Sequence, residues 1–110
     1  MNWEKEFPAA ITVTDIENKI IYMNERSLQV FEKDGGSKLL GANLFECHSA
    51  PSNEIIEEII SSKKTNVYTI EKNGIKKLIY QSPWYENGEY KGLVELSLEI
   101  PFDMPHFVRS

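Results

Sequence analysis

The fold is decided by residues 66–100, NVYTIEKNGIKKLIYQSPWYENGEYKGLVELSLEI. Two Asn-Gly pairs, Asn73-Gly74 and Asn87-Gly88, divide this stretch into three runs with the composition of β-strands. Asn-Gly is typical of two-residue hairpin turns, because both residues tolerate the positive φ angles of a type I′ turn. The stretch therefore predicts an antiparallel meander of three strands. We expect these strands at residues 66–71, 75–85 and 89–100.

The last of the three strands has the clearest pattern. Val94, Leu96 and Leu98 alternate with Glu95 and Ser97. Because side chains along a strand point alternately to the two faces of a sheet, the apolar set shares one face. The alternation predicts that this apolar face is buried, and that the face with Glu95 is wet or partly covered.

The first part of the chain predicts two more strands, at residues 10–15 and 20–23. Both are rich in β-branched residues, and the polar segment between them contains Asn18, a good turn residue. Asp15 and Asn24 stand at the strand ends. We interpret them as turn and helix-cap residues, and signal coupling through backbone hydrogen bonds is the alternative.

Short helices are expected between the second and third strands. A first helix after Asn24 carries Leu28 and Phe31 on one edge, and Ser37 to Leu40 forms one further turn. Ser52 is a suitable N-cap for a second helix. That helix has a stripe of isoleucines at helical spacing, Ile55, Ile56, Ile59 and Ile60.

The bulk composition predicts one cytoplasmic domain over residues 1–110, with an N-terminal cap segment (1–8), a core (9–100) and a tail (101–110). The net charge of −5 argues against nucleic acid and anionic membrane surfaces as partners. A single cysteine, Cys47, fits a reducing compartment. The sequence contains no signal-peptide pattern and no apolar run of membrane-spanning length.

Five short motifs in order resemble the PAS family of sensory domains. They are Ile11-Thr12-Val13-Thr14-Asp15, Ile20-Ile21-Tyr22-Met23-Asn24, Leu39-Leu40-Gly41, Asn43-Leu44 and Gly92-Leu93-Val94-Glu95. The resemblance spans roughly Pro8 to Ile100. It implies an α+β fold, in which a five-stranded antiparallel sheet of order 2-1-5-4-3 carries short helices on one face. It also implies a small cavity between helices and sheet.

The resemblance implies a function in signal transduction. PAS domains bind haem, flavin, organic acids, fatty acids or nothing, dimerise, and pass a conformational change to an output such as transcription regulation. Almost no output segment is attached here, so we expect either a stand-alone sensor or a piece of a longer regulator. The alternatives are a ligand-free protein-interaction module and, least favoured, a small enzyme that uses Cys47 or His48. We therefore expect no enzyme activity.

The partners that we expect are a small-molecule ligand, a second copy of the chain and a signalling output protein. Trp3 and Phe7 are apolar residues four apart in a charged leader, and they are the candidate dimer interface. The candidate pocket residues are Phe31, Phe45, Cys47, His48, Ile55, Ile59, Tyr80, Gln81 and Leu96. In the meander, the Gln81 amide or a tyrosine hydroxyl could orient a ligand, whereas cross-strand aromatic packing is the simpler interpretation. The strand register leaves open which face is inward.

Cys47-His48 is the sharpest local chemical feature. Its simpler interpretation is a buried thiol beside a hydrogen-bonded histidine, and the alternatives are axial ligation of haem by His48 or a redox role for Cys47, so the cofactor stays unknown. Light-sensing relatives carry Gly-x-Asn-Cys, whereas Leu44 stands at that cysteine position, so a flavin adduct is not expected. The sequence has no Gly-rich phosphate loop, no catalytic triad pattern and no metal-spaced cluster.

Overall fold

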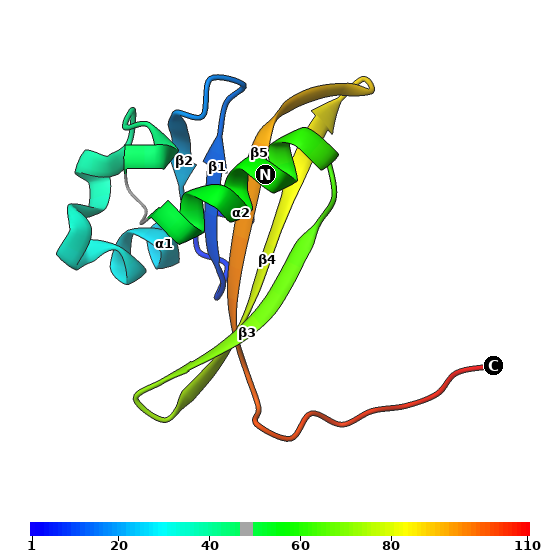
Figure 1. Cartoon of the computed structure of the whole chain (residues 1–110). Helices are drawn as coiled ribbons and strands as arrows, with labels where there is room; N and C mark the ends of the chain where they lie inside the picture. Colours follow the sequence, from blue (N-terminus) through cyan, green and yellow to red (C-terminus); the bar gives the residue numbers. More distant parts are fainter. Residues whose placement is uncertain (47–49) are drawn as a thin grey trace.

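The computed structural model describes residues 1–46 and 50–110. Its centre is a five-stranded antiparallel sheet in the order β2-β1-β5-β4-β3 (Figure 1), which confirms the predicted order. The strands are β1 (Ala10–Thr14), β2 (Ile20–Met23), β3 (Asn66–Lys72), β4 (Ile75–Glu86) and β5 (Glu89–Ile100).

Between β2 and β3, the described residues form two α-helices and three short 3-10 turns. They are α1 (Glu25–Val30), η1 (Glu32–Asp34), η2 (Gly36–Leu39), η3 (Leu44–Glu46) and α2 (Ala50–Ser62). In Figure 1, α2 crosses the sheet over β5 and β4, and the shorter helical pieces gather beside β2. Because α2 begins at Ala50, Ser52 lies inside the helix, and its prediction as the N-cap is wrong.

Both predicted hairpin turns are present. The φ angles are +54° at Asn73, +77° at Gly74, +52° at Asn87 and +81° at Gly88, as a type I′ turn requires. Pro83 is tolerated inside β4 because the pairing of β4 with β3 ends at Gln81.

The cross-strand register defines two adjacent rows of side chains on opposite faces. The covered face is the side of Thr12, Glu95, Gln81 and Asn66, which are successive neighbours across β1, β5, β4 and β3. Ser27 of α1 bonds to Thr12 on this side, so the helices cover it. The open face is the side of Ile11, Leu96, Tyr80 and Val67, which form the next row across the same strands.

This register corrects the expected orientation of β5. The alternation is present, but the covered face carries Glu95 and Ser97, whereas Leu96 and Leu98 lie on the open face. The physical reason is that polar groups on the covered face are hydrogen-bonded around a cavity, so this face need not be the apolar one.

The apolar core lies between α2 and the Leu93 end of β5. Leu44, Ile56, Ile59 and Leu93 form its buried cluster. Phe45, Ile60 and Tyr90 are partly buried and pack against it. Of the isoleucine stripe, Ile56 and Ile59 are each 3% exposed, whereas Ile55 is 46% exposed and points away from the core.

Gly92 allows β5 to approach the end of β1. Its φ is +143°, and an added Cβ atom would lie 2.1 Å from the carbonyl oxygen of Thr14. Trp84, the cross-strand neighbour of Gly92, donates its Nε1–H to that same oxygen over 2.9 Å. A side chain at position 92 is therefore excluded by both backbone angle and space.

Candidate functional site: a cavity under the helices

A cavity of about 410 Å³ lies between the covered face of the sheet and the helical segment. Its size falls within the range of small-molecule sites, which is roughly 300–1,000 Å³. Apolar walls come from both the sheet and the helices. In the described part of the chain the lining residues are Thr12, Thr14, Ile20, Met23, Phe31, Asp34, Leu39, Leu44, Glu46, Ile56, Ile59, Gln81, Leu93, Val94 and Glu95.

The structure brings three of the predicted pocket residues to this cavity. Phe31, Ile59 and Gln81 line it, one each from the end of α1, from α2 and from β4. Phe45 packs behind the wall against the apolar core. Cys47 and His48 lie outside the described residues, so the predictions for them stay untested.

The other three predicted pocket residues lie elsewhere. Ile55 is exposed on α2 and borders a shallow depression between α2 and the start of β3. Tyr80 and Leu96 are neighbours on the open face of the sheet. The row that carries them is shifted by one residue along each strand from the row that lines the cavity. Its side chains therefore lie on the opposite face of the sheet.

A chain of hydrogen bonds crosses the sheet on the covered face. The Asn66 Nδ2 group donates to Oε1 of Gln81 over 2.9 Å, and the Gln81 Nε2 group donates to Oε2 of Glu95 over 2.8 Å. An ionised carboxylate only accepts hydrogen bonds, so Glu95 fixes the orientation of both amides. The chain ends at Glu95, on the cavity wall.

The same face carries two bonded hydroxyl groups on β1. Thr12 Oγ1 lies 2.6 Å from Ser27 Oγ of α1, and Thr14 Oγ1 accepts from the Leu93 backbone N–H over 3.0 Å. Ser27 and Thr14 are almost fully buried, at 0% and 2% exposure. Their hydroxyl groups tie α1 and β5 to the strand between them.

The charge of Glu95 acts on a neighbouring tyrosine. Burial raises the pKa of Tyr68 above its ordinary value, and the nearby Glu95 carboxylate adds to that rise. Tyr68 lies opposite Ile79 on β4, on the same face as Asn66. The negative field of Glu95 therefore extends along the covered face.

The charged groups around the cavity are all acidic in the described residues. Glu95 is partly buried, whereas Asp34 and Glu46 are exposed at the margin. Within residues 1–46 and 50–110, no group of three or more His, Cys, Asp or Glu residues is placed to hold a metal ion. The cavity thus has an acidic margin and one inner carboxylate.

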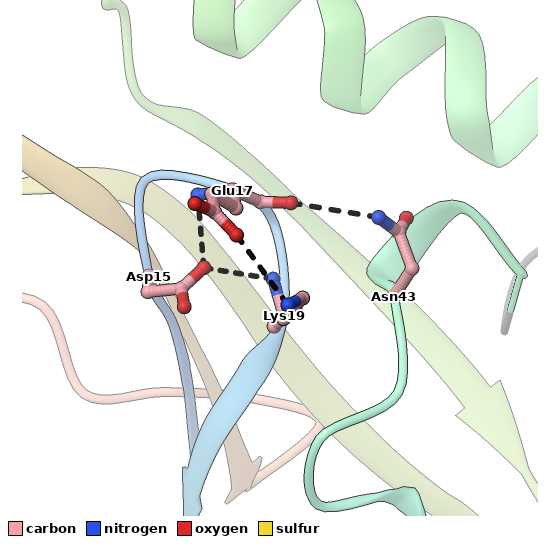
Figure 2. A network of polar contacts seen from close by, with 4 residues as sticks. All are labelled: Asp15, Glu17, Lys19 and Asn43. Atoms are coloured by element: carbon pink, nitrogen blue, oxygen red, sulfur yellow. Dashed lines mark hydrogen bonds and ion pairs between the residues drawn. The ribbon is translucent and has the colours of Figure 1, made fainter.

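A network at the β1–β2 turn supports one wall of the cavity (Figure 2). Oδ1 of Asp15 accepts from the backbone N–H groups of Glu17 at 2.9 Å and Lys19 at 3.0 Å, which confirms its role as a turn residue. Across the turn, Asn43 donates from Nδ2 to the Glu17 carbonyl. The Leu44 backbone N–H donates to the Asn18 carbonyl over 2.7 Å. These bonds hold η3 beside the cavity.

Asn24 confirms its predicted role as the N-cap of α1 and has further contacts. Its Oδ1 accepts from the backbone N–H groups of Ser27 and Ile11, at 3.0 and 2.9 Å. Its Nδ2 donates to the carbonyl groups of Glu4 and Ala9, each over 2.8 Å. Asn24 is 1% exposed, and its amide joins the N-terminal segment to β1 and α1.

The candidate dimer residues lie on that N-terminal segment. Trp3 and Phe7 form an edge-to-face pair with ring centroids 5.3 Å apart. They are 60% and 44% exposed. The rings contact each other and leave apolar surface accessible to a partner.

Sequence reasoning did not identify Glu95, Thr12 and Ser27 as site residues. Glu95 stands at a polar position of a strand, where the simple interpretation is a solvated surface group. The signal that could have found it is the row pairing of β1, β5 and β4, which depends on the register. Ser27 is an ordinary residue in a short helix, and no sequence signal distinguishes it.

Comparison with known proteins supports the fold alone. No protein-family model matches the sequence, and no curated protein matches it. Solved structures do match. The PAS domain of the histidine kinase ThkA aligns with a TM-score of 0.66 at 16% identity, covering 81% of this chain and 96% of that one. The Aer2 receptor of Vibrio cholerae, described as a dual PAS-haem oxygen sensor, aligns with a TM-score of 0.61 at 17% identity, covering 84% and 95%.

A third similar structure is a longer protein. VqmA bound to DPO aligns with a TM-score of 0.67 at 13% identity, covering 89% of this chain and 55% of VqmA. VqmA of Vibrio cholerae has also been solved with ligand and DNA, and there this chain covers 48% of it. The chain therefore spans about half of VqmA. Together, the sheet order and these neighbours show that the chain has the PAS fold.

No helix within residues 1–46 and 50–110 has the length and apolar character needed to cross a membrane.

Proposed function

We propose that the protein is a cytoplasmic sensory module that binds a small ligand in the cavity under its helices. The cavity carries this proposal, because it combines a volume of about 410 Å³ with apolar walls and a few fixed polar groups. Small-molecule sites have this composition. Binding there would contact Phe31 at the C-terminal cap of α1, α2 and the sheet at once, so occupancy can alter their relative positions.

We further propose that the signal passes to a second copy of the chain or to an output protein. The open-face row of Ile11, Leu96, Tyr80 and Val67 supports this, because its exposure increases from 8% at Ile11 to 49% at Val67. The exposed pair of Trp3 and Phe7 adds apolar surface. VqmA is a dimer in one of its structures. We propose no nucleic acid as a partner of this chain, given its net charge of −5.

The test is to release and identify what the purified protein holds. An ultraviolet–visible spectrum is recorded first, and mass spectrometry is then applied to the supernatant of the denatured protein. A Soret band that is lost in His48→Ala supports a haem sensor, and a flavin spectrum supports a redox or light response. A colourless released metabolite identifies the ligand class.

Two adjacent leucines provide a matched control for the cavity. Leu39 lines it, whereas Leu40 is 45% exposed and stands outside the described lining. Leu39→Trp fills the cavity with an indole ring, so we expect at least about tenfold less released ligand, a loss of roughly 1.4 kcal/mol in binding. Leu40→Trp should retain the ligand.

The second candidate function is a ligand-free interaction module, which the open-face row favours. It predicts that the wild-type protein releases nothing and that no metabolite raises its melting temperature. That pair of results would overturn the ligand proposal and leave the partner proposal in place.

A further inference from the structure

We propose that the cavity binds an organic cation whose charged donor group pairs with Glu95. The ligand class is an amine or amidine on a flat or branched apolar body. This inference rests on the proposed function, because it requires that the cavity is a ligand site.

The first step is the direction of the hydrogen-bond chain. Asn66 donates to Gln81, and Gln81 donates to Oε2 of Glu95, so the chain presents an acceptor at its inner end. Among the described residues, nothing donates to the other oxygen, Oε1, of Glu95. A ligand group that completes this carboxylate must therefore be a donor.

The second step is the charge of the cavity. Glu95 forms no ion pair within the described part of the chain, where the three ion pairs involve other residues. The described lining contains Asp34 and Glu46 and no Lys, Arg or His. A cation would gain attraction from this field, whereas a carboxylate ligand would be repelled. Organic acids and fatty acids are therefore disfavoured occupants.

The third step is the shape of the apolar part. Most of the lining away from Glu95 is aliphatic, with Ile20, Leu39 and Ile56 on different elements and Phe31 beside them. Such walls favour an apolar body over a compact inorganic ion. A metal ion is also disfavoured, since the acidic groups in the described residues do not form a metal-holding cluster.

The experiment uses three probes of the same shape and different charge. They are 2-naphthamidine (cationic), 2-naphthamide (neutral) and 2-naphthoate (anionic). Binding to the full chain is measured by titration calorimetry and by ligand-observed NMR, after ligand carried from the cell has been removed. We expect the amidine to bind at least about tenfold more tightly than the amide, and the acid to bind most weakly.

Glu95→Gln tests the role of the carboxylate directly. It keeps an oxygen that can accept from Gln81 and removes the charge, so the fold should be retained. We expect about tenfold weaker binding of 2-naphthamidine and less than about threefold change for 2-naphthamide. Glu99→Gln is the matched control, because Glu99 lies on the same face of β5, outside the described lining, and its change alters the net charge equally. It should leave both affinities unchanged.

The outcomes separate the inference from the proposed function. If all three probes bind alike, or the acid binds best, and Leu39→Trp abolishes their binding, the cavity is a ligand site and the cation inference is wrong. If no probe binds, or Leu39→Trp changes no affinity, the proposed site fails and the inference fails with it. Unchanged amidine binding to a folded Glu95→Gln variant also overturns the inference.

Discussion

The two faces of the sheet differ more than their sequences suggest. Thr12, Glu95, Gln81 and Asn66 form a polar row under the helices, and the row one residue away is apolar and lies on the opposite face. In a simple two-layer fold the polarity is the reverse, with the apolar face covered. Here the covered face holds fixed polar groups around a cavity. The open face presents Leu96, Tyr80 and Val67.

This difference separates two kinds of stabilising contact. On the covered face, each polar side chain in the row makes at least one hydrogen bond, which offsets part of the cost of burying it. On the open face, apolar side chains remain accessible and gain free energy when a partner removes them from water. The covered face is therefore suited to a small ligand, and the open face to another protein chain.

The largest expected effect on stability comes from a substitution that disturbs both faces of the sheet together. Gly92→Ala places a Cβ atom 2.1 Å from the Thr14 carbonyl oxygen, so β5 must move away from β1. We expect a loss of at least about 3 kcal/mol in the free energy of unfolding, or failure to fold. Denaturant titration measures this. Gly88→Ala, at φ +81° with no atom within 4 Å of the added Cβ, should cost only about 1 kcal/mol. Equal losses in the two variants would contradict the close approach of the strands.

A smaller effect on stability tests the contribution of the polar groups on the covered face. Thr12→Val removes the hydroxyl that bonds Ser27, whose side chain is fully buried, so we expect a loss of roughly 1–3 kcal/mol in the free energy of unfolding. Val13→Thr makes the reverse change at the adjacent position on the open face, where no buried hydrogen-bond partner loses its contact. We expect less than about 1 kcal/mol there. Thermal melts of both variants compare the two losses of stability. A Thr12→Val variant as stable as wild type would contradict the prediction.

The smallest effect on folding tests the open face. Val67→Glu places a charge in the apolar row, whereas Ile70→Glu places one on the opposite side of β3 at similar exposure, 41% against 49%. We expect Val67→Glu to weaken self-association at least about tenfold, with stability changed by less than about 0.5 kcal/mol. Light scattering over a concentration series measures the dimer. A wild-type protein that stays monomeric at high concentration would overturn the dimer proposal.

Much of the fold could be predicted because its signals are local. The Asn-Gly turns fix two hairpins through backbone angles that few other residue pairs adopt. Asn24 and Asp15 act in their predicted roles as cap and turn residues. The order of the strands followed from the resemblance, because no single motif determines which strands lie side by side.

The cavity wall could not be predicted because it depends on one irregularity. The pair Glu86 and Glu89 closes the second hairpin, and regular pairing from there would place Gln81 opposite Val94. The register shift between Trp84 and Tyr85 places Gln81 opposite Glu95 instead. A one-residue slip moves every side chain to the other neighbour and face, and a bulge leaves little trace in composition. The hydrogen-bond chain to Glu95 exists only in the shifted register.

Asn24 gives the N-terminal segment a mechanical connection to the rest of the molecule. One rigid, planar amide group holds the chain at Glu4, at Ala9 to Ile11 and at Ser27. A displacement of any of these three points strains the hydrogen bonds to the other two, because all of them share the same planar amide. Asn24 thus links the N-terminal segment, β1 and α1 through a single side chain. A displacement of the segment that carries Trp3 and Phe7 would therefore reach Ser27 in the first turn of α1 through Asn24, and Phe31, the C-cap residue of α1, lines the cavity.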